Sequence, residues 1–164
     1  MLPAIDAPSV EVLLFEVSGQ GYGLAAGDVQ EVVRAALPVP LPKAPDVVEG
    51  VLNLRGKIVP VFDIRRRFGH SVKPLEPDDQ FIIARSQQRL VALHVDRTTA
   101  LVQLDAEQLE AARAVVPGAE YVSWMAKLAD GVALIHDLHT FLSRAESAEL
   151  DAALTALEPE GSAV

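Results

Sequence analysis

The sequence predicts a mostly β protein with two similar β-rich halves and one C-terminal helix. Three observations support this fold class: short apolar runs alternate with turn residues, a strand followed by a capping Asp occurs twice, and the last apolar repeat has helical spacing. The chain has 164 residues, of which 50% are hydrophobic and 23% are charged. These values are typical of one folded domain, or of two small subdomains that share a core.

The first elements are an arm and a pair of strands. Residues 1–9 contain two prolines and predict a flexible arm. Residues 10–17 are rich in Val and Leu and predict a strand, residues 18–21 are turn formers, and residues 22–26 predict the return strand.

A short helix is expected next, at residues 29–35, because Asp28 can cap its first turn. Four prolines among residues 38–45 then keep the backbone extended. Residues 48–54 and 58–62 predict a hairpin around a tight Arg-Gly-Lys turn.

Pro60 lies inside the second strand of this hairpin and has no N–H, so we expect an edge or a bulge there. Asp63 follows and can cap helical turns at residues 64–68. The pattern Val-Phe-Asp-Ile at 61–64 returns as Ile-His-Asp-Leu at 135–138, about half a chain later. We favour duplication of a β unit that ends in a short helix, although so short a repeat is also compatible with chance.

The second half is again β-rich. Residues 70–79 hold two prolines and two aspartates and predict a linker. Asp105 and Gln108 have the spacing of a capping box, and apolar residues three and four apart at 146–157 predict an amphipathic helix. Strands are expected at residues 81–84, 90–95, 100–104, 121–125 and 132–136.

The composition argues against several classes of function. The chain contains no Cys, which excludes disulfides, thiolate metal sites and a cysteine nucleophile. Its net charge of -9 argues against binding to nucleic acid or to anionic membrane surfaces. The sequence shows neither an apolar run that could span a bilayer nor the basic start of a signal peptide. We therefore expect a cytoplasmic protein that does not insert into a membrane.

Residues 50–65 read Gly-Val-Leu-Asn-Leu-Arg-Gly-Lys-Ile-Val-Pro-Val-Phe-Asp-Ile-Arg. Together with Val29, Glu31 and Pro45 before it, this run resembles the CheW-like family of chemotaxis adaptors. The family pattern joins a G-V-x-N-L-R-G run, a proline among apolar residues, and D-L/I-R. The resemblance covers about residues 10–157.

The resemblance implies two tandem SH3-like, five-stranded β-barrels with short helices and a C-terminal helix at 144–157. The two subdomains would span about residues 10–73 and 80–143, and exchange of strands between them is left open. It also implies a non-enzymatic scaffold without a cofactor or metal. Its partners would be the cytoplasmic helical tip of a chemoreceptor and the regulatory domain of a CheA-type histidine kinase, in membrane-associated receptor arrays. A CheW-like adaptor of a non-flagellar pathway, such as pilus-driven motility, is the alternative.

Positions that contact the receptor in this family match Val29, Glu31 and Arg55. We expect Glu31 and Arg55 to lie close together, because the planar Arg fork can hold a carboxylate with two bonds. Val29 would then line an apolar rim, and it would share a face with Glu31 only if this segment is extended. The alternative is that Arg55 merely satisfies carbonyls of its own turn.

Arg55, Lys57 and Arg65–Arg67 form a basic cluster in an acidic chain. Either Lys57, Arg65 and Arg66 contribute to an interface with an acidic partner surface, or the arginines are the solvated face of a short helix. A phosphate site is not expected, because no Gly-rich loop precedes the cluster.

Two histidines, His94 and His136, interrupt strands and are expected at a barrel rim. A small metal-dependent hydrolase that uses His136, Asp137 and His139 is the remote alternative function, but no nucleophile or third convergent ligand supports it. Trp124 either packs into a gap of the core or serves as an exposed contact anchor, and we favour packing.

Overall fold

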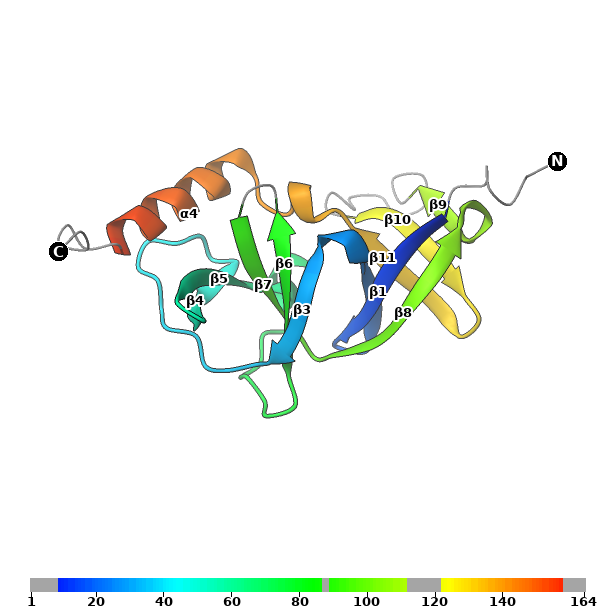
Figure 1. The fold of residues 1–164 in the computed structure, drawn as a ribbon, viewed down its shortest axis with the longest axis horizontal. Helices are drawn as coiled ribbons and strands as arrows, with labels where there is room; N and C mark the ends of the chain where they lie inside the picture. Colours follow the sequence, from blue (N-terminus) through cyan, green and yellow to red (C-terminus); the bar gives the residue numbers. More distant parts are fainter. Residues whose placement is uncertain (1–8, 87–88, 112–121, 158–164) are drawn as a thin grey trace.

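The computed structural model describes residues 9–86, 89–111 and 122–157, which form two β-sheets side by side and a C-terminal helix (Figure 1). The mostly β fold class with a C-terminal helix is confirmed. In Figure 1 the helix lies at the end of the molecule that holds the five-stranded sheet.

The first sheet has six strands in the order β8-β1-β2-β11-β10-β9. All neighbours in it are antiparallel except β11 and β2, which are parallel. Its strands are β1 (Ser9–Val17), β2 (Gln20–Ala25), β8 (Arg97–Asp105), β9 (Leu109–Ala111), β10 (Val122–Leu128) and β11 (Gly131–His136).

The second sheet has five strands in the order β3-β6-β7-β5-β4. Here too a single pair, β5 and β7, is parallel. Its strands are β3 (Val29–Arg34), β4 (Val48–Leu54), β5 (Lys57–Asp63), β6 (Gln80–Ser86) and β7 (Arg89–Val95).

The two sheets have matching connectivity. In each sheet, the second strands of two hairpins pair in parallel. In the six-stranded sheet these are β2 of the β1–β2 hairpin and β11 of the β10–β11 hairpin, and in the five-stranded sheet they are β7 of the β6–β7 hairpin and β5 of the β4–β5 hairpin. The sheets do not divide the chain at the linker, because the six-stranded sheet joins β1 and β2 from the start of the chain to β8–β11 from its second half. Strands are therefore exchanged between the two halves of the sequence.

Short helical elements follow the strands at equivalent places. Asp63 accepts the Arg66 N–H at 3.1 Å and caps α2 (Ile64–Arg67) after β5. Asp137 accepts the His139 N–H at 2.9 Å and caps the 3₁₀ turn η3 (Leu138–Thr140) after β11. The repeated strand–Asp–helix pattern of the sequence thus corresponds to a repeated structural unit. The other helical elements are η1 (Ala26–Asp28), η2 (Ala106–Gln108) and α4 (Arg144–Leu157).

The predicted helix at 29–35 is wrong, because this segment is the edge strand β3. Val29, Val32 and Val33 are β-branched and favour a strand, and the segment pairs along its length with β6. Asp28 belongs to η1 (Ala26–Asp28), where no side chain caps the turn. The pairing partner lies about fifty residues away in the sequence, so no local signal specified it.

Three apolar clusters hold the fold together. One lies against the six-stranded sheet and one against the five-stranded sheet, while the largest lies between the sheets and receives side chains from both. Helix α4 packs onto this central cluster through Leu150 and Ala153. The fully buried large residues of the central cluster include Phe15, Leu24, Phe62, Leu93, Leu138 and Phe141.

Among the described helices, none combines the length and apolar character that crossing a membrane requires.

Candidate protein-interaction surface

Glu31 and Arg55 form an exposed ion pair that joins the two edges of the five-stranded sheet. Glu31 lies in the edge strand β3, and Arg55 lies at the tip of the hairpin that ends in the other edge strand, β4. The guanidinium Nη2 of Arg55 donates to Oε2 of Glu31. The expected proximity of these two residues is therefore present, and the pair bridges the gap between β3 and β4.

The hairpin turn presents Arg55 in a fixed position. Arg55 has φ 50° and Gly56 has φ 89°, the pair of positive angles that a two-residue hairpin turn of the primed type requires. Gly56 supplies such an angle without strain, and its N–H donates to Oδ1 of Asn53 at 2.7 Å. The Asn-Leu-Arg-Gly segment thus builds a rigid turn that aims Arg55 at β3.

The pair remains accessible to a partner. The Arg55 side chain is 65% exposed and that of Glu31 is 30% exposed. The hydrogen bond from Arg55 holds the pKa of Glu31 below its ordinary value, so Glu31 is ionised at neutral pH. Because a guanidinium has five N–H donors, Arg55 can hold Glu31 and still donate to a second acceptor.

Val29 does not lie beside this pair, although the segment is extended. The register of β3 shifts between Val29 and Glu31, so that Val29 pairs with Ala84 while Glu31 pairs with Ile83. Ala84 and Ile83 are neighbours in β6 and point to opposite faces of the sheet, so their partners Val29 and Glu31 do so as well. Val29 packs against the central core. The segment is thus extended, but the bulge keeps Val29 and Glu31 from sharing a face.

An apolar groove of about 440 Å³ instead lies next to the hairpin. Two of its residues, Val39 and Ile58, are 61% and 50% exposed, and Ile58 lies in β5, three residues after Arg55. Sequence reasoning missed this groove, since strand periodicity alone does not distinguish an exposed Ile from a buried one. Its lining residues are Val39, Val51, Leu52, Asn53, Ile58, Leu154 and Leu157.

The basic cluster is divided between surface and interior. Arg65 is 2% exposed and forms an ion pair with Asp96, so this candidate interface residue does not lie on a docking surface. Arg67 is also largely buried, with Nη2 at 2.7 Å from Glu146. Arg66 and Lys57 are exposed and remain candidate interface residues. The reading of all three arginines as a solvated helix face is therefore wrong as well.

His94 is buried between two carboxylates, and its expected place at a barrel rim is wrong. Its Nδ1 lies 2.7 Å from Glu49 and its Nε2 lies 2.8 Å from Asp79. Burial lowers the pKa of His94, but hydrogen bonds and charge from Glu49 and Asp79 outweigh burial, and the net shift is upward. Because ionised carboxylates only accept hydrogen bonds, this geometry favours the form of His94 in which both ring nitrogens carry a proton and donate.

His136 is also buried rather than at a rim. Its ring lies among the rings of Phe15, Phe68 and Phe141, and neither ring nitrogen has a hydrogen-bond partner. Burial lowers its pKa to about 3, so the ring is neutral at physiological pH. His136 is thus a polar residue enclosed in the central core.

Trp124 is 45% exposed, so it does not plug a gap inside the core as favoured from the sequence. Trp124 belongs to β10 of the six-stranded sheet. Together with Val10, Leu109 and Ile135 it lines an apolar cavity of about 380 Å³. This placement fits the other sequence reading, an exposed contact residue.

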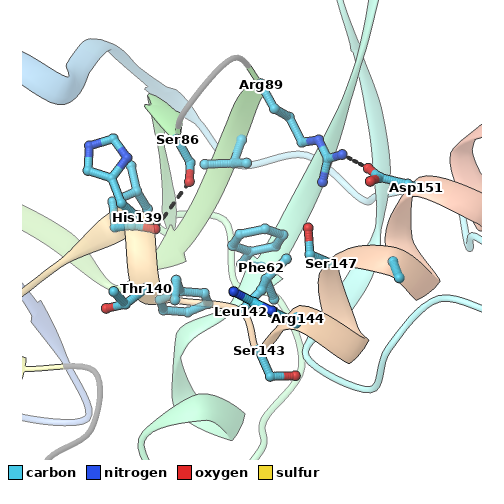
Figure 2. Close-up of a pocket in the computed structure, with 14 residues that line it drawn as sticks. Phe62, Ser86, Arg89, His139, Thr140, Leu142, Ser143, Arg144, Ser147 and Asp151 are labelled. Carbon is cyan, nitrogen blue, oxygen red and sulfur yellow. Dashed lines mark hydrogen bonds and ion pairs between the residues drawn. The ribbon is translucent and has the colours of Figure 1, made fainter.

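A second cavity, of about 650 Å³, lies between β7 and the start of α4 (Figure 2). Two of its polar side chains pair with each other, Arg89 with Asp151, and the Ser86 hydroxyl donates to the Leu138 backbone carbonyl at 3.1 Å. None of the predicted contact residues lines it. Across residues 9–86, 89–111 and 122–157, no three His, Asp or Glu side chains are grouped so that they could hold a metal ion.

A family model for the CheW-like domain matches residues 11–146 of the chain, which include the ion pair and both sheets except the first two residues of β1. This chain belongs to the CheW-like domain family. The CheW-like chain is 31% identical to the chemotaxis protein CheW of Klebsiella aerogenes over 143 residues, with 86% of each chain covered. It is 26% identical to CheW of Treponema pallidum over 153 residues, with 90% of each chain covered.

Among solved structures, the CheW-like chain is similar to the scaffolding protein TtCheW of Thermoanaerobacter tengcongensis. The TM-score is 0.77 at 29% sequence identity, and the match covers 85% of this chain and 96% of TtCheW. The resemblance found in the sequence is therefore confirmed at the level of family and fold.

Proposed function

We propose that this chain is a non-catalytic chemotaxis scaffold. It couples the cytoplasmic helical tip of a chemoreceptor to the regulatory domain of a CheA-type histidine kinase. The relatives named as chemotaxis protein CheW and the solved scaffolding protein support this proposal. The observation that carries it is the exposed Glu31–Arg55 pair, held on a rigid turn at the open side of a sheet.

The receptor is proposed to contact Arg55 and the apolar groove beside it. Arg55 is preorganised by Glu31, so little side-chain entropy remains to be lost when a partner accepts its free N–H groups. The neighbouring Ile58 and Val39 supply apolar surface that a helix can cover. A helical tip with one apolar face and polar flanks matches both features. Val29 acts indirectly in this proposal, by holding β3 against the core.

The kinase is proposed to bind elsewhere on the molecule, so that both partners bind at once and the protein acts as a scaffold in receptor arrays. Exposed Lys57 and Arg66 are proposed to assist association with acidic partner surfaces by electrostatic attraction rather than by tight contacts.

The proposal is tested with purified receptor-tip and kinase regulatory fragments at micromolar concentration. We expect the wild-type chain to capture both. Arg55→Glu should lose receptor capture by tenfold or more while keeping kinase capture, because it places an acid against Glu31 and removes the donors. Arg85→Glu, which reverses an exposed arginine on β6, is the matched control and should behave as wild type.

Capture of neither partner by the wild type would overturn the scaffold proposal. Capture of receptors from a pilus-type pathway but not of flagellar chemoreceptors would support the alternative pathway instead. Equal loss in the Arg55 and Arg85 variants would show that charge alone, and not the Glu31–Arg55 geometry, governs receptor binding.

A further inference from the structure

Strand β8 presents an open backbone edge. It is the end strand of the six-stranded sheet and pairs with β1 along its length. Near its two ends the edge is occupied by side chains, since Gln80 accepts the Thr98 N–H at 2.6 Å and Gln108 accepts the Asp105 N–H at 3.1 Å. Between these ends, at residues 99–104, no strand of the described chain lies on the outer side.

Both edges of the five-stranded sheet, β3 and β4, are protected, whereas the described edge of β8 is not. Edge strands that avoid pairing usually carry charges or prolines, or are covered. The edge of β4 is covered by Val39, which exchanges two backbone hydrogen bonds of 2.8 Å with Val51. The edge strand β3 carries Glu31 and Arg34. In contrast, residues 98–104 of β8 contain no charge and no proline, and Leu101 is 59% exposed.

The charges at the ends of β8 indicate what pairs with it. Arg97 begins the strand with a side chain that is 67% exposed, and Asp105 ends it and is exposed. When two copies of β8 lie antiparallel, the start of each meets the end of the other, so opposite charges meet at both ends. Leu101 lies at the centre, where two copies of its side chain come together.

The register is compatible with this arrangement. Residues 100, 102 and 104 pair with Leu14, Val12 and Val10, whose side chains face the core cluster of the six-stranded sheet, while Leu101 points to the other face. With a twofold axis through Leu101, the core-facing side chains of both copies lie on one face of the joined sheet, and the two Leu101 side chains lie on the other. The bulge between Leu14 and Phe15 displaces Arg97 by one position, so its long side chain reaches Asp105 of the other copy from the neighbouring position.

We propose that β8 is a self-association edge, through which two copies of this chain form a twofold symmetric dimer with a sheet that continues from one copy to the other. A symmetric contact of this kind uses the same edge of both copies and therefore closes at two. The Glu31–Arg55 pair belongs to the other sheet and stays free in the dimer. The proposal stands independently of the partners proposed above.

Sedimentation equilibrium of the purified chain tests this proposal. We expect a monomer–dimer equilibrium whose dissociation constant rises about tenfold or more in Arg97→Glu and in Asp105→Lys, because each variant places like charges at both ends of the paired strands. Each variant also loses a contact within its own chain, so thermal unfolding of each monomer is measured alongside.

Mixing the two variants separates the interface from folding. Arg97→Glu and Asp105→Lys have complementary ends when paired with each other, so the mixture should form a heterodimer with nearly wild-type affinity. The double variant should likewise recover the homodimer. Leu101→Lys should abolish pairing at the centre, whereas Leu37→Lys, at a residue that is 83% exposed elsewhere, should leave the dimer unchanged.

A chain that remains monomeric up to about 1 mM would overturn the proposal. So would a dimer that Leu101→Lys does not weaken, or a variant mixture that shows no heterodimer, since each result would place the contact on a different surface.

Discussion

The buried His94 links three segments of the chain through charge. Its ring in β7 donates to Glu49 in β4 and to Asp79 at the end of the 70–79 segment, and the Phe81 ring packs edge-on against it. Because its pKa is raised in the folded chain, the unfolded chain releases its proton first as pH rises. The stabilisation by His94 is therefore complete below its ordinary pKa and is lost as pH rises through the folded pKa.

Replacing His94 by Gln should remove this pH dependence. At pH 6 we expect the free energy of unfolding to fall by about 1.5–3 kcal/mol, the range for hydrogen bonds to charged groups. The loss should shrink as pH increases above the folded pKa. Urea unfolding of both proteins between pH 5 and 9 measures this difference, and a loss that is constant over the whole range would contradict the charged state assigned to His94.

For His136 we expect the opposite dependence of stability on pH. Its folded pKa of about 3 lies below the ordinary value of 6.5, so the unfolded chain binds a proton more readily. Wild-type stability should therefore fall as pH drops from 6.5 towards 3. His136→Leu removes the unpartnered ring nitrogens and should stabilise the protein by about 1 kcal/mol at neutral pH, with a larger gain in acid. Thermal unfolding at pH 7 and pH 5 tests both statements, and a destabilised variant with unchanged acid sensitivity would refute them.

Among the elements, the β4–β5 hairpin was predictable and β3 was not. The hairpin has local signals: a Gly in the turn, an Asn that binds the turn N–H, and a capping Asp after its second strand. Pro60 also fits, since it pairs with Val51 while the parallel pairing with β7 starts only at Val61. Strand β3 depends on β6, a partner that is distant in sequence, and a nearby Asp suggested a helix cap instead.

The candidate site was likewise predictable only in part. A family motif identified Glu31 and Arg55, and their opposite charges predicted the ion pair that the structure contains. The burial of Arg65, His94 and His136 could not be read from the sequence, because each is enclosed by elements from distant parts of the chain. A polar side chain inside a strand does not reveal whether that strand is covered on both faces.

The Arg65–Asp96 ion pair connects α2 to the residue between β7 and β8, where the chain passes from one sheet to the other, and its contribution to stability can be measured. Asp96 follows β7, where the chain passes to β8, and it also accepts the Ser18 N–H at 2.8 Å. Arg65→Met removes the buried guanidinium from Asp96, but this carboxylate is 24% exposed and keeps the Ser18 N–H and Lys73 at 4.0 Å. The change should therefore cost about 1–3 kcal/mol. Adding Asp96→Asn should restore part of the loss. Urea unfolding of the two single variants and the double variant measures the coupling, and strictly additive losses would show that the two side chains do not interact.

At the scale of the whole molecule, strand exchange predicts that the halves of the chain depend on each other. The six-stranded sheet takes β1 and β2 from before the linker, and the central core receives side chains from both sheets. A chain cut within residues 70–79 therefore leaves each fragment with an incomplete sheet and an exposed apolar face. We expect each fragment alone to be unfolded, and an equimolar mixture to regain the β-rich circular dichroism spectrum.

The intact chain should correspondingly unfold in one transition, because the largest apolar cluster takes side chains from both sheets. Trp124 reports on the six-stranded sheet through its fluorescence, and far-ultraviolet circular dichroism reports on both sheets together. The two urea transitions should coincide in midpoint. Separate midpoints, or a first fragment that unfolds cooperatively by itself, would mean that the sheets are independent units and that the shared core contributes little to their stability.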